Sequence, residues 1–313
     1  MRNTAPEKRS PDRLDRLLDR FDVLLDRIEA VLPATAKAPD WRASSAFRWR
    51  KHQGAGFLQP VARPHGIRFG DLQGVDRQKA LIEANTRQFV AGKPANNVLL
   101  TGARGTGKSS LVKAALNGFS ARGLRLIEVD KSDLVDLPDI ADLVADRPER
   151  FIIFCDDLSF EASEVAYKAL KAVLDGSIAA PSDNLLVYAT SNRRHLMPEY
   201  MHENLEYKHL GEEIHPGEGS EEKISLSERF GLWVSFYPFD QDHYLGIVDH
   251  WLEHFGARTS QLAHEEALRW ALGRGSRSGR VAWQFARDWA GRHGTAVSSK
   301  RSQKATHAVK ARR

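Results

Sequence analysis

Residues 102–109 read Gly-Ala-Arg-Gly-Thr-Gly-Lys-Ser, which is a complete Gly-x-x-x-x-Gly-Lys-Ser phosphate-binding loop. The apolar run 97–101 before it predicts a buried strand, and residues 110–116 after it have helical spacing. Glycines in such a loop let backbone N–H groups turn inward around phosphate oxygens, where a Cβ would obstruct. The start of the following helix adds partial positive charge. The segment therefore favours phosphate binding over a Gly-rich turn that follows a strand by chance.

The loop also predicts which nucleotide and which metal bind. Lys108 can reach the β- and γ-phosphates, and the Ser109 hydroxyl can bind Mg²⁺. No Asn-Lys-x-Asp segment for reading guanine occurs in the sequence, so we expect ATP rather than GTP. The residues expected to hold the nucleotide are Gly102, Ala103, Arg104, Gly105, Thr106, Gly107, Lys108, Ser109 and Ser110.

Two carboxylates follow the apolar strand expected at residues 151–155. The carboxyl ends of parallel strands border the crevice that holds a ligand. We therefore expect Asp156 to hold Mg²⁺ with Ser109, and Asp157 to orient or deprotonate the attacking water. Asn192 follows the next apolar strand; it either helps to position that water or serves as a helix cap or turn residue.

Two arginines stand where they can meet phosphates. Arg229 lies just before the apolar strand 232–236, where it can face the nucleotide of a neighbouring subunit, or can be a surface arginine. Arg280 opens an expected helix and can reach a phosphate from there. Arg229 is the reason to expect a homo-oligomer.

The elements that position these residues alternate in type. Five apolar strands are expected at 97–101, 124–129, 151–155, 185–189 and 232–236, with helices between them. This alternation predicts an α/β fold with a parallel sheet covered on both faces. From about 240 to 290 the pattern is helical only, which predicts a small helical lid whose core includes Trp251 and Trp283.

Four regions are expected along the chain. Residues 1–65 should hold an irregular linker and an amphipathic helix over 12–32, which packs on the protein's own core, self-associates or binds a partner. Aromatic residues of this linker, Trp41, Phe47 and Trp49, either dock it onto the next domain or stack on bases. The other regions are the nucleotide-binding domain 66–239, the lid 240–291 and the disordered basic tail 292–313.

Composition limits the classes of protein that fit. The chain has 313 residues, 42% of them hydrophobic, and no apolar run of the roughly 18 residues that a membrane helix needs. The single cysteine, Cys155, excludes an intramolecular disulfide. We expect a cytoplasmic protein with no membrane partner. The tail from Arg292 has no acidic residue, so it either contacts nucleic acid or simply keeps the chain soluble.

The order of these motifs resembles the AAA+ ATPases. Segments 96–102, 154–161 and 189–196 are similar to an uncharacterised bacterial AAA+ family catalogued as a domain of unknown function, and the resemblance covers about residues 65–290. It implies a P-loop NTPase fold with a five-stranded parallel sheet in the order 5-1-4-3-2 and a helical lid. It also implies that Gly74 lies near adenine, Asn192 is sensor 1, Arg229 is the arginine finger and Arg280 is sensor 2.

Two features depart from most AAA+ members. Asp157 stands where most carry Glu, although the replication-initiator clade is similar in using Asp-Asp; Glu161 is a candidate to assist it. Residues 130–138 lack the aromatic pore loop of unfoldases, which disfavours threading of polypeptide. The Glu- and Gly-rich insertion 203–227 is expected to be a flexible loop that faces a partner.

These observations predict Mg²⁺-dependent binding and hydrolysis of ATP, coupled to remodelling of an unknown protein partner. One alternative is a switch that binds ATP and hydrolyses it slowly. The other is a DNA-associated loader of the initiator type, which the Asp-Asp pair and the basic tail favour.

Overall fold

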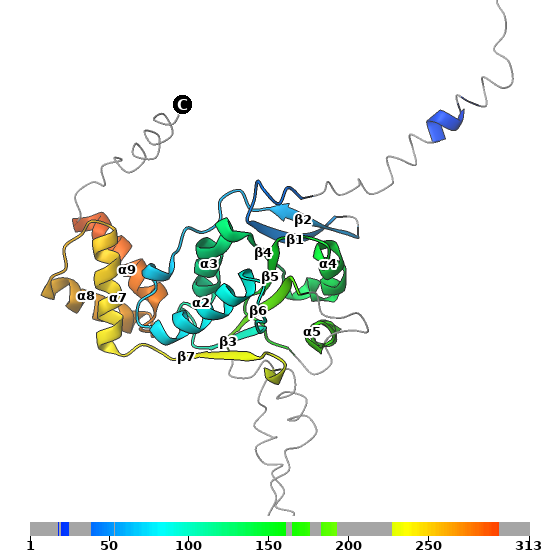
Figure 1. The fold of residues 1–313 in the computed structure, drawn as a ribbon. Helices are drawn as coiled ribbons and strands as arrows, with labels where there is room; N and C mark the ends of the chain where they lie inside the picture. Colours follow the sequence, from blue (N-terminus) through cyan, green and yellow to red (C-terminus); the bar gives the residue numbers. More distant parts are fainter. Residues whose placement is uncertain are drawn as a thin grey trace, which may run out of the picture.

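A seven-stranded sheet is the centre of the molecule (Figure 1). The computed structural model describes residues 18, 20–24, 39–52, 54–160, 165–175, 183–192 and 227–293. The strands are β1 (Ala46–His52), β2 (Ala55–Pro60), β3 (Val98–Gly102), β4 (Leu124–Glu128), β5 (Arg150–Cys155), β6 (Leu185–Ser191) and β7 (Leu232–Phe236). They lie in the order β2-β1-β4-β5-β6-β3-β7.

Five parallel strands form the part of the sheet that the sequence predicted. In the order β7-β3-β6-β5-β4 they reproduce the expected arrangement 5-1-4-3-2, and every neighbouring pair among them is parallel. Their middle residues are buried, as expected for apolar strands covered on both faces. The carboxyl ends of β3, β5 and β6 lie side by side, which brings the P-loop and residues 156, 157 and 192 to one edge.

The expected strand count was wrong, because residues 46–60 form a hairpin and not an irregular linker. Strand β1 pairs antiparallel with β2 and parallel with β4, so the sheet has seven strands rather than five. Phe47 and Trp49 point into the core, while Arg48 and Arg50 face outward and pair with acidic residues after and within β4. This alternation is the period-2 pattern of a half-buried strand. Burial of Trp41, Phe47 and Trp49 confirms that these aromatics dock on the domain.

Helices cover both faces of the sheet. On one face, α2 (Asp76–Val90) and α3 (Lys108–Phe119) pack in one apolar core. On the other, α4 (Leu137–Val144) and α5 (Val165–Asp175) pack in a second core with the 3₁₀ helix η3 (Lys131–Asp136). Figure 1 shows α2 and α3 on one side of the strands, at the left, and α4 and α5 on the other side, at the right. Short 3₁₀ turns lie at Phe69–Asp71 (η1) and Ser120–Arg122 (η2).

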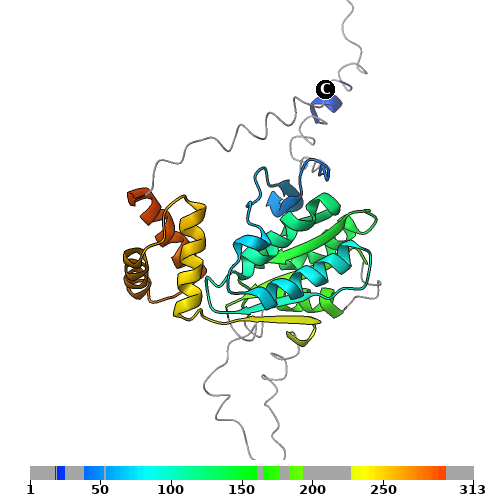
Figure 2. The ribbon, with the colours of Figure 1, turned by 60° about the vertical axis from the view of Figure 1, so that its left-hand side comes forward.

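Three further helices form a separate unit, here called the C-terminal helical unit, residues 241–293. Its helices are α7 (Gln241–His254), α8 (Gln261–Gly273) and α9 (Gly279–His293), and they share an apolar core of their own. Side chains of Asp240 and Ser260 cap the first two helices by accepting a backbone N–H. Figure 2 shows this unit standing beside the sheet domain, with β7 leading into α7. The expected all-helical pattern is confirmed.

Some expectations fall largely outside the described residues. Of the expected helix 12–32, residues 18 and 20–24 are described and helical, and Leu18, Phe21 and Leu24 are more than half exposed. The expectation that this face packs on the protein's own core is therefore wrong for these residues. Glu161, the insertion 203–226 and the tail 294–313 lie outside the described part of the chain. Within that part, no helix is long and apolar enough to cross a membrane.

Candidate functional site

The P-loop connects β3 to α3 through three glycines whose backbone is left-handed. Gly102, Gly105 and Gly107 have φ values of 126°, 75° and 103°, a region that favours glycine. Gly102 is also needed for space, because a Cβ there would lie 1.9 Å from the carbonyl oxygen of Phe236. Helix α3 begins at Lys108, so its free N–H groups open onto the loop.

The ammonium of Lys108 is held at the centre of the site. Its Nζ donates to the carbonyl oxygens of Gly102 (2.7 Å) and Ala103 (2.8 Å) and to Oδ1 of Asn192 (3.0 Å). Burial lowers the pKa of Lys108 from 10.5 to about 8, against the opposing effect of the nearby carboxylates. A buried cation surrounded by neutral acceptors gains from an incoming anion, which is the property that a phosphate site needs.

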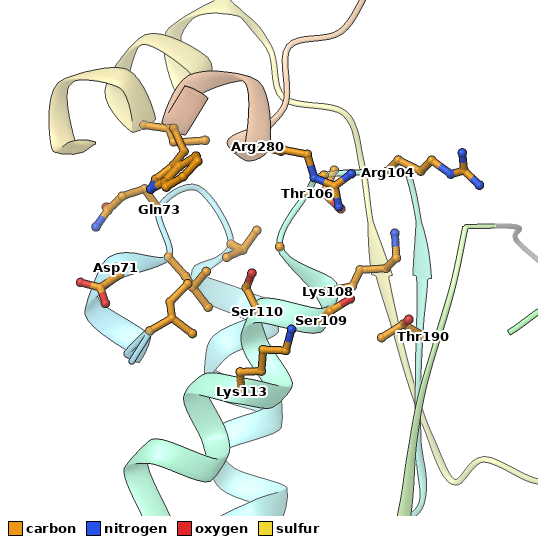
Figure 3. Close-up of a pocket in the computed structure, with 18 of the residues that line it drawn as sticks. Asp71, Gln73, Arg104, Thr106, Lys108, Ser109, Ser110, Lys113, Thr190 and Arg280 are labelled. Atoms are coloured by element: carbon orange, nitrogen blue, oxygen red, sulfur yellow. The ribbon is translucent and has the colours of Figure 1, made fainter. Parts of the chain in front are cut away.

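Ser109, Asp156 and Thr190 form one hydrogen-bonded group beside Lys108. The Ser109 hydroxyl donates to Oδ1 of Asp156 at 2.6 Å, and the Thr190 hydroxyl donates to the same oxygen at 2.5 Å. Thr190 Oγ1 also accepts the backbone N–H of Asp157 at 2.9 Å. Figure 3 shows Ser109 and Thr190 next to Lys108. Thr190 was not among the predicted site residues. The sequence feature that could have identified it is a hydroxyl near the carboxyl end of the strand beside β5.

Asp157 has an unusual backbone that explains why this position is not Glu. Its φ is 54°, the one positive value among the described non-glycine residues. Asp and Asn tolerate this left-handed region better than residues with longer side chains. The Asn192 amide donates to Oδ1 of Asp157, and the Arg104 guanidinium lies 3.7 Å from Oδ2. The two polar residues expected beside the attacking water therefore contact each other.

A cavity of about 600 Å³ joins these groups to the C-terminal helical unit. Arg280 lines it from the start of α9, and its backbone N–H lies 3.4 Å from the carbonyl oxygen of Gly105. Figure 3 shows the Arg280 side chain directed toward Thr106, on the side of the loop where Lys108 also lies. Positive charge from two different parts of the fold thus faces one space.

The rest of the cavity wall is a mixture of apolar and polar side chains that sequence reasoning did not assign to the site. These residues are His65, Ile67, Asp71, Leu72, Gln73, Val75, Lys113, Phe239, Ile247, Trp251, Gly279 and Trp283. The sequence analysis placed Trp251 and Trp283 in the core, because aromatic residues at helical spacing predict burial. Both are half-buried and border the cavity. Apolar walls beside a polar phosphate end suit a nucleotide base.

Four expected site residues of the described part do not border the cavity: Gly74, Gly102, Ala103 and Arg229. Gly102 and Ala103 still belong to the site, because their carbonyl oxygens accept from Lys108. Gly74 (φ 72°) does not border the cavity, although its neighbours Gln73 and Val75 do; it packs instead against the ring of Phe239. Arg229 lies near the start of β7 and pairs with Asp175 at the end of α5. Its expected role across a subunit boundary stays a prediction.

Residues 42–293 match the protein family described as "Protein of unknown function (DUF815)". The chain belongs to the DUF815 family. No curated protein matches this DUF815 chain.

Three solved structures are similar to this DUF815 chain. The replication initiator DnaA bound to AMPPCP and single-stranded DNA has a TM-score of 0.50 at 14% identity, covering 76% of this chain and 68% of that chain. The Thermotoga maritima RuvB Holliday junction branch migration motor has 0.48 at 18% identity, covering 72% and 65%. The FIGL-1 AAA domain in complex with ADP has 0.46 at 19% identity, covering 70% of each.

The fold of this DUF815 chain is the α/β P-loop NTPase fold of AAA+ proteins, as the resemblance implied. The likeness to the DnaA structure, at 14% identity, shows the fold and does not show an activity. The chain spans 65% of the length of the T. maritima RuvB structure.

Proposed function

We propose that this chain is a Mg²⁺-dependent ATPase of the AAA+ type that acts as an oligomer and remodels a protein partner. The observation that carries the proposal is the convergence of Lys108, the Ser109–Asp156 pair, the Asp157–Asn192 pair and Arg280 on one cavity. These groups match the needs of phosphoryl transfer to water, which are phosphate positioning, a metal site and an oriented nucleophile.

The residues present fit Mg²⁺ and a nucleotide. Ser109 and Asp156 offer hard oxygen donors 2.6 Å apart, directly beside the phosphate loop. Among the described residues no group of three or more His, Cys, Asp or Glu gathers as a metal site, which agrees with a metal held partly by phosphate and water. Bound Mg²⁺ would neutralise charge that develops on the phosphate oxygens. Thr190 fixes the orientation of the Asp156 carboxylate.

The remaining roles belong to groups around the γ-phosphate position. Lys108 and Arg280 bind phosphate oxygens, and Asp157 with Asn192 orients and deprotonates the attacking water. Glu161 stays a candidate to assist Asp157. The basic tail stays a candidate for contact with nucleic acid, and the cytoplasm stays the proposed location.

A slow switch is a second candidate, and the contacts of Asp157 favour it. Oδ1 of Asp157 accepts from Asn192 and Oδ2 lies 3.7 Å from the Arg104 guanidinium, so an attacking water must share both oxygens with these neighbours in this arrangement. Steady-state phosphate release with Mg²⁺ and with EDTA separates the two candidates. An ATPase turns over far above background only with Mg²⁺. Tight ATP binding with turnover near background would replace the ATPase with the switch.

ATP affinity is expected to fall as the pH rises above about 8. Burial lowers the pKa of Lys108 to about 8, so the free protein loses this charge above that pH. A bound phosphate chain favours the charged form of Lys108. Above about pH 8, ATP binding is therefore accompanied by uptake of a proton by this lysine. Affinity should drop by up to about tenfold per pH unit above pH 8. Titrations with a fluorescent ATP analogue between about pH 7 and pH 9.5 measure this slope.

The matched control is Lys108→Arg, whose guanidinium keeps its charge over this range. Its affinity should be lower overall but nearly independent of pH. Equal slopes for the two proteins would show that another group titrates.

Arg229→Ala is expected to slow hydrolysis by about 10³-fold or more while ATP binding is retained, because an arginine finger acts on the transition state. Asp175 pairs with Arg229 within the same subunit, so Asp175→Asn, which weakens this pair, should leave turnover normal or raise it. Turnover should also rise steeply with protein concentration. Unchanged activity of Arg229→Ala in a strictly monomeric protein would remove the finger from the proposal.

A further inference from the structure

A second hollow lies on the C-terminal helical unit, on a face formed by α8 and α9. We call it the α8–α9 groove; its volume is about 530 Å³, and its lining includes Trp270, Arg274, Trp283, Arg287 and Arg292. In Figure 1, α9 lies between α8 and the sheet domain. In Figure 2, α8 and α9 lie beside α7. Of these five residues, Trp283 alone also borders the nucleotide cavity, and the roles proposed above use none of the other four.

The groove contains the same pair of side chains twice. Trp270 is followed four residues later by Arg274, and Trp283 is followed four residues later by Arg287, a spacing that puts both members on one side of a helix. The guanidinium carbon of Arg274 lies 5.2 Å from the centre of the Trp270 ring, and that of Arg287 lies 5.3 Å from the Trp283 ring. Stacking on an indole fixes each guanidinium and leaves its N–H groups for an anion.

These two arginines differ from others on the same unit. Arg269 pairs with Glu266 and Arg292 pairs with Asp288, whereas Arg274 and Arg287 have no ion-pair partner among the described residues. Both are exposed. An exposed, oriented and uncompensated guanidinium beside an aromatic ring suits a ligand that carries both negative charge and flat rings.

The charge of the surrounding sequence points the same way. Residues 267–313 contain a single acidic residue, Asp288, and twelve basic ones. The basic residues are Arg269, Arg274, Arg277, Arg280, Arg287, Arg292, Lys300, Arg301, Lys304, Lys310, Arg312 and Arg313. The six that follow His293, the last residue of α9, lie outside the described part. A polyanion is the complementary partner.

The tryptophans decide which polyanion fits. An acidic peptide would satisfy Arg274 and Arg287 but would leave the two indoles without flat partners. Duplex nucleic acid offers phosphates but keeps its bases stacked inside. A single strand offers phosphates and free bases together, and aromatic stacking of such bases is tolerant of sequence.

We propose that the α8–α9 groove binds single-stranded nucleic acid, with phosphates on Arg274 and Arg287 and bases against Trp270 and Trp283. The test uses the full chain and a labelled 20-nucleotide oligothymidylate, followed by fluorescence anisotropy at several salt concentrations. Arg274→Gln and Arg287→Gln should each weaken binding about tenfold. The double variant should lower the slope of log affinity against log salt by about 1.4, because each phosphate contact on a single strand contributes about 0.7.

Two further variants test whether binding depends on the groove itself or only on the positive charge of the chain. Arg258→Gln removes an exposed arginine that lies between α7 and α8 and does not line the groove, so affinity should stay within twofold. Gly291→Leu adds bulk to the groove wall without removing charge; a Cβ there meets no atom within 4 Å, so the helix has room for it. This variant should weaken binding by about tenfold. Basal ATP turnover should be unchanged in all four single variants, which keeps this test independent of the ATPase proposal.

Several outcomes would overturn the proposal. If the unaltered chain did not bind the oligonucleotide at low salt, the groove would have no such ligand. If Arg274→Gln, Arg287→Gln and Gly291→Leu all bound normally, contact would lie in the tail. If poly-glutamate competed as well as unlabelled oligothymidylate at equal charge, the partner would be an acidic protein.

Discussion

Lys108→Ala is expected to abolish measurable ATP binding, with a loss of about 10²–10⁴-fold. Each hydrogen bond to a charged group contributes about 1.5–3 kcal/mol, and we expect the ammonium to donate at least two to the bound phosphates. Lys108 is buried, and its Nζ is the cation nearest to the P-loop carbonyls. Isothermal titration with ATP and Mg²⁺ measures the loss.

The same residue makes a second prediction that concerns stability. Burial lowers the pKa of Lys108 from 10.5 to about 8, so the folded state binds its proton less tightly than the unfolded chain. The charged lysine therefore destabilises the ligand-free fold below pH 8, and this cost fades as the pH rises from 8 to 10.5. Lys108→Met should raise Tm at pH 7, and the gain should shrink toward pH 10.

Lys93→Ala is the control for both measurements, because Lys93 is exposed and does not border the cavity. It should change neither ATP affinity nor Tm. Normal ATP binding by Lys108→Ala would remove the nucleotide site from this loop. A lower Tm for Lys108→Met at pH 7 would show that the hydrogen bonds of the ammonium outweigh its burial.

Asp157→Asn is expected to slow hydrolysis by about 10²–10⁴-fold, the usual contribution of a positioned base, while ATP binding is retained. Asparagine is the right replacement because φ at this residue is 54°, and Asn adopts that region readily. The amide keeps a hydrogen-bonding group beside Asn192 but cannot accept a proton from water. Single-turnover hydrolysis of bound ATP isolates the chemical step from binding.

Asp146→Asn is the matched control, since Asp146 is exposed and lies outside the cavity. Its turnover should equal that of the unaltered protein. If Asp157→Asn also hydrolysed ATP normally, another carboxylate would be the base, and Glu161 would be the first to test. If the unaltered protein itself turned over at the background rate, the switch proposed above would stand instead.

The sequence predicted those parts of the site that have a fixed local pattern. Lys108, Ser109 and Asp156 follow from a loop and a strand end, because phosphate and metal binding restrict both spacing and residue type. Thr190 was missed, since a hydroxyl within an apolar strand has no distinguishing neighbour and acquires its role only when β6 lies beside β5.

The fold was predictable to a similar extent. The apolar pattern predicted the five central strands, and the resemblance implied their order. The hairpin of β1 and β2 was not predicted. Its alternation of Phe47, Arg48, Trp49 and Arg50 is short and lies within a stretch rich in Pro and Gly. Trp251 and Trp283 were predicted to lie in the core, because their helical spacing indicates an apolar helix face. Spacing does not indicate whether that face packs against another helix or borders a cavity.

The ring of Phe239 connects the sheet domain to the C-terminal helical unit and packs against the apolar cores of both. Glycines face it from either body: a Cβ on Gly74 would lie 3.2 Å from the ring, and one on Gly279 would lie 4.0 Å from it. Arg280 is the next residue along the chain. A side chain at Gly74 would therefore displace the phenyl ring toward the start of α9 and move Arg280 away from the phosphate loop. The position of this ring thus determines how the two halves of the cavity are aligned.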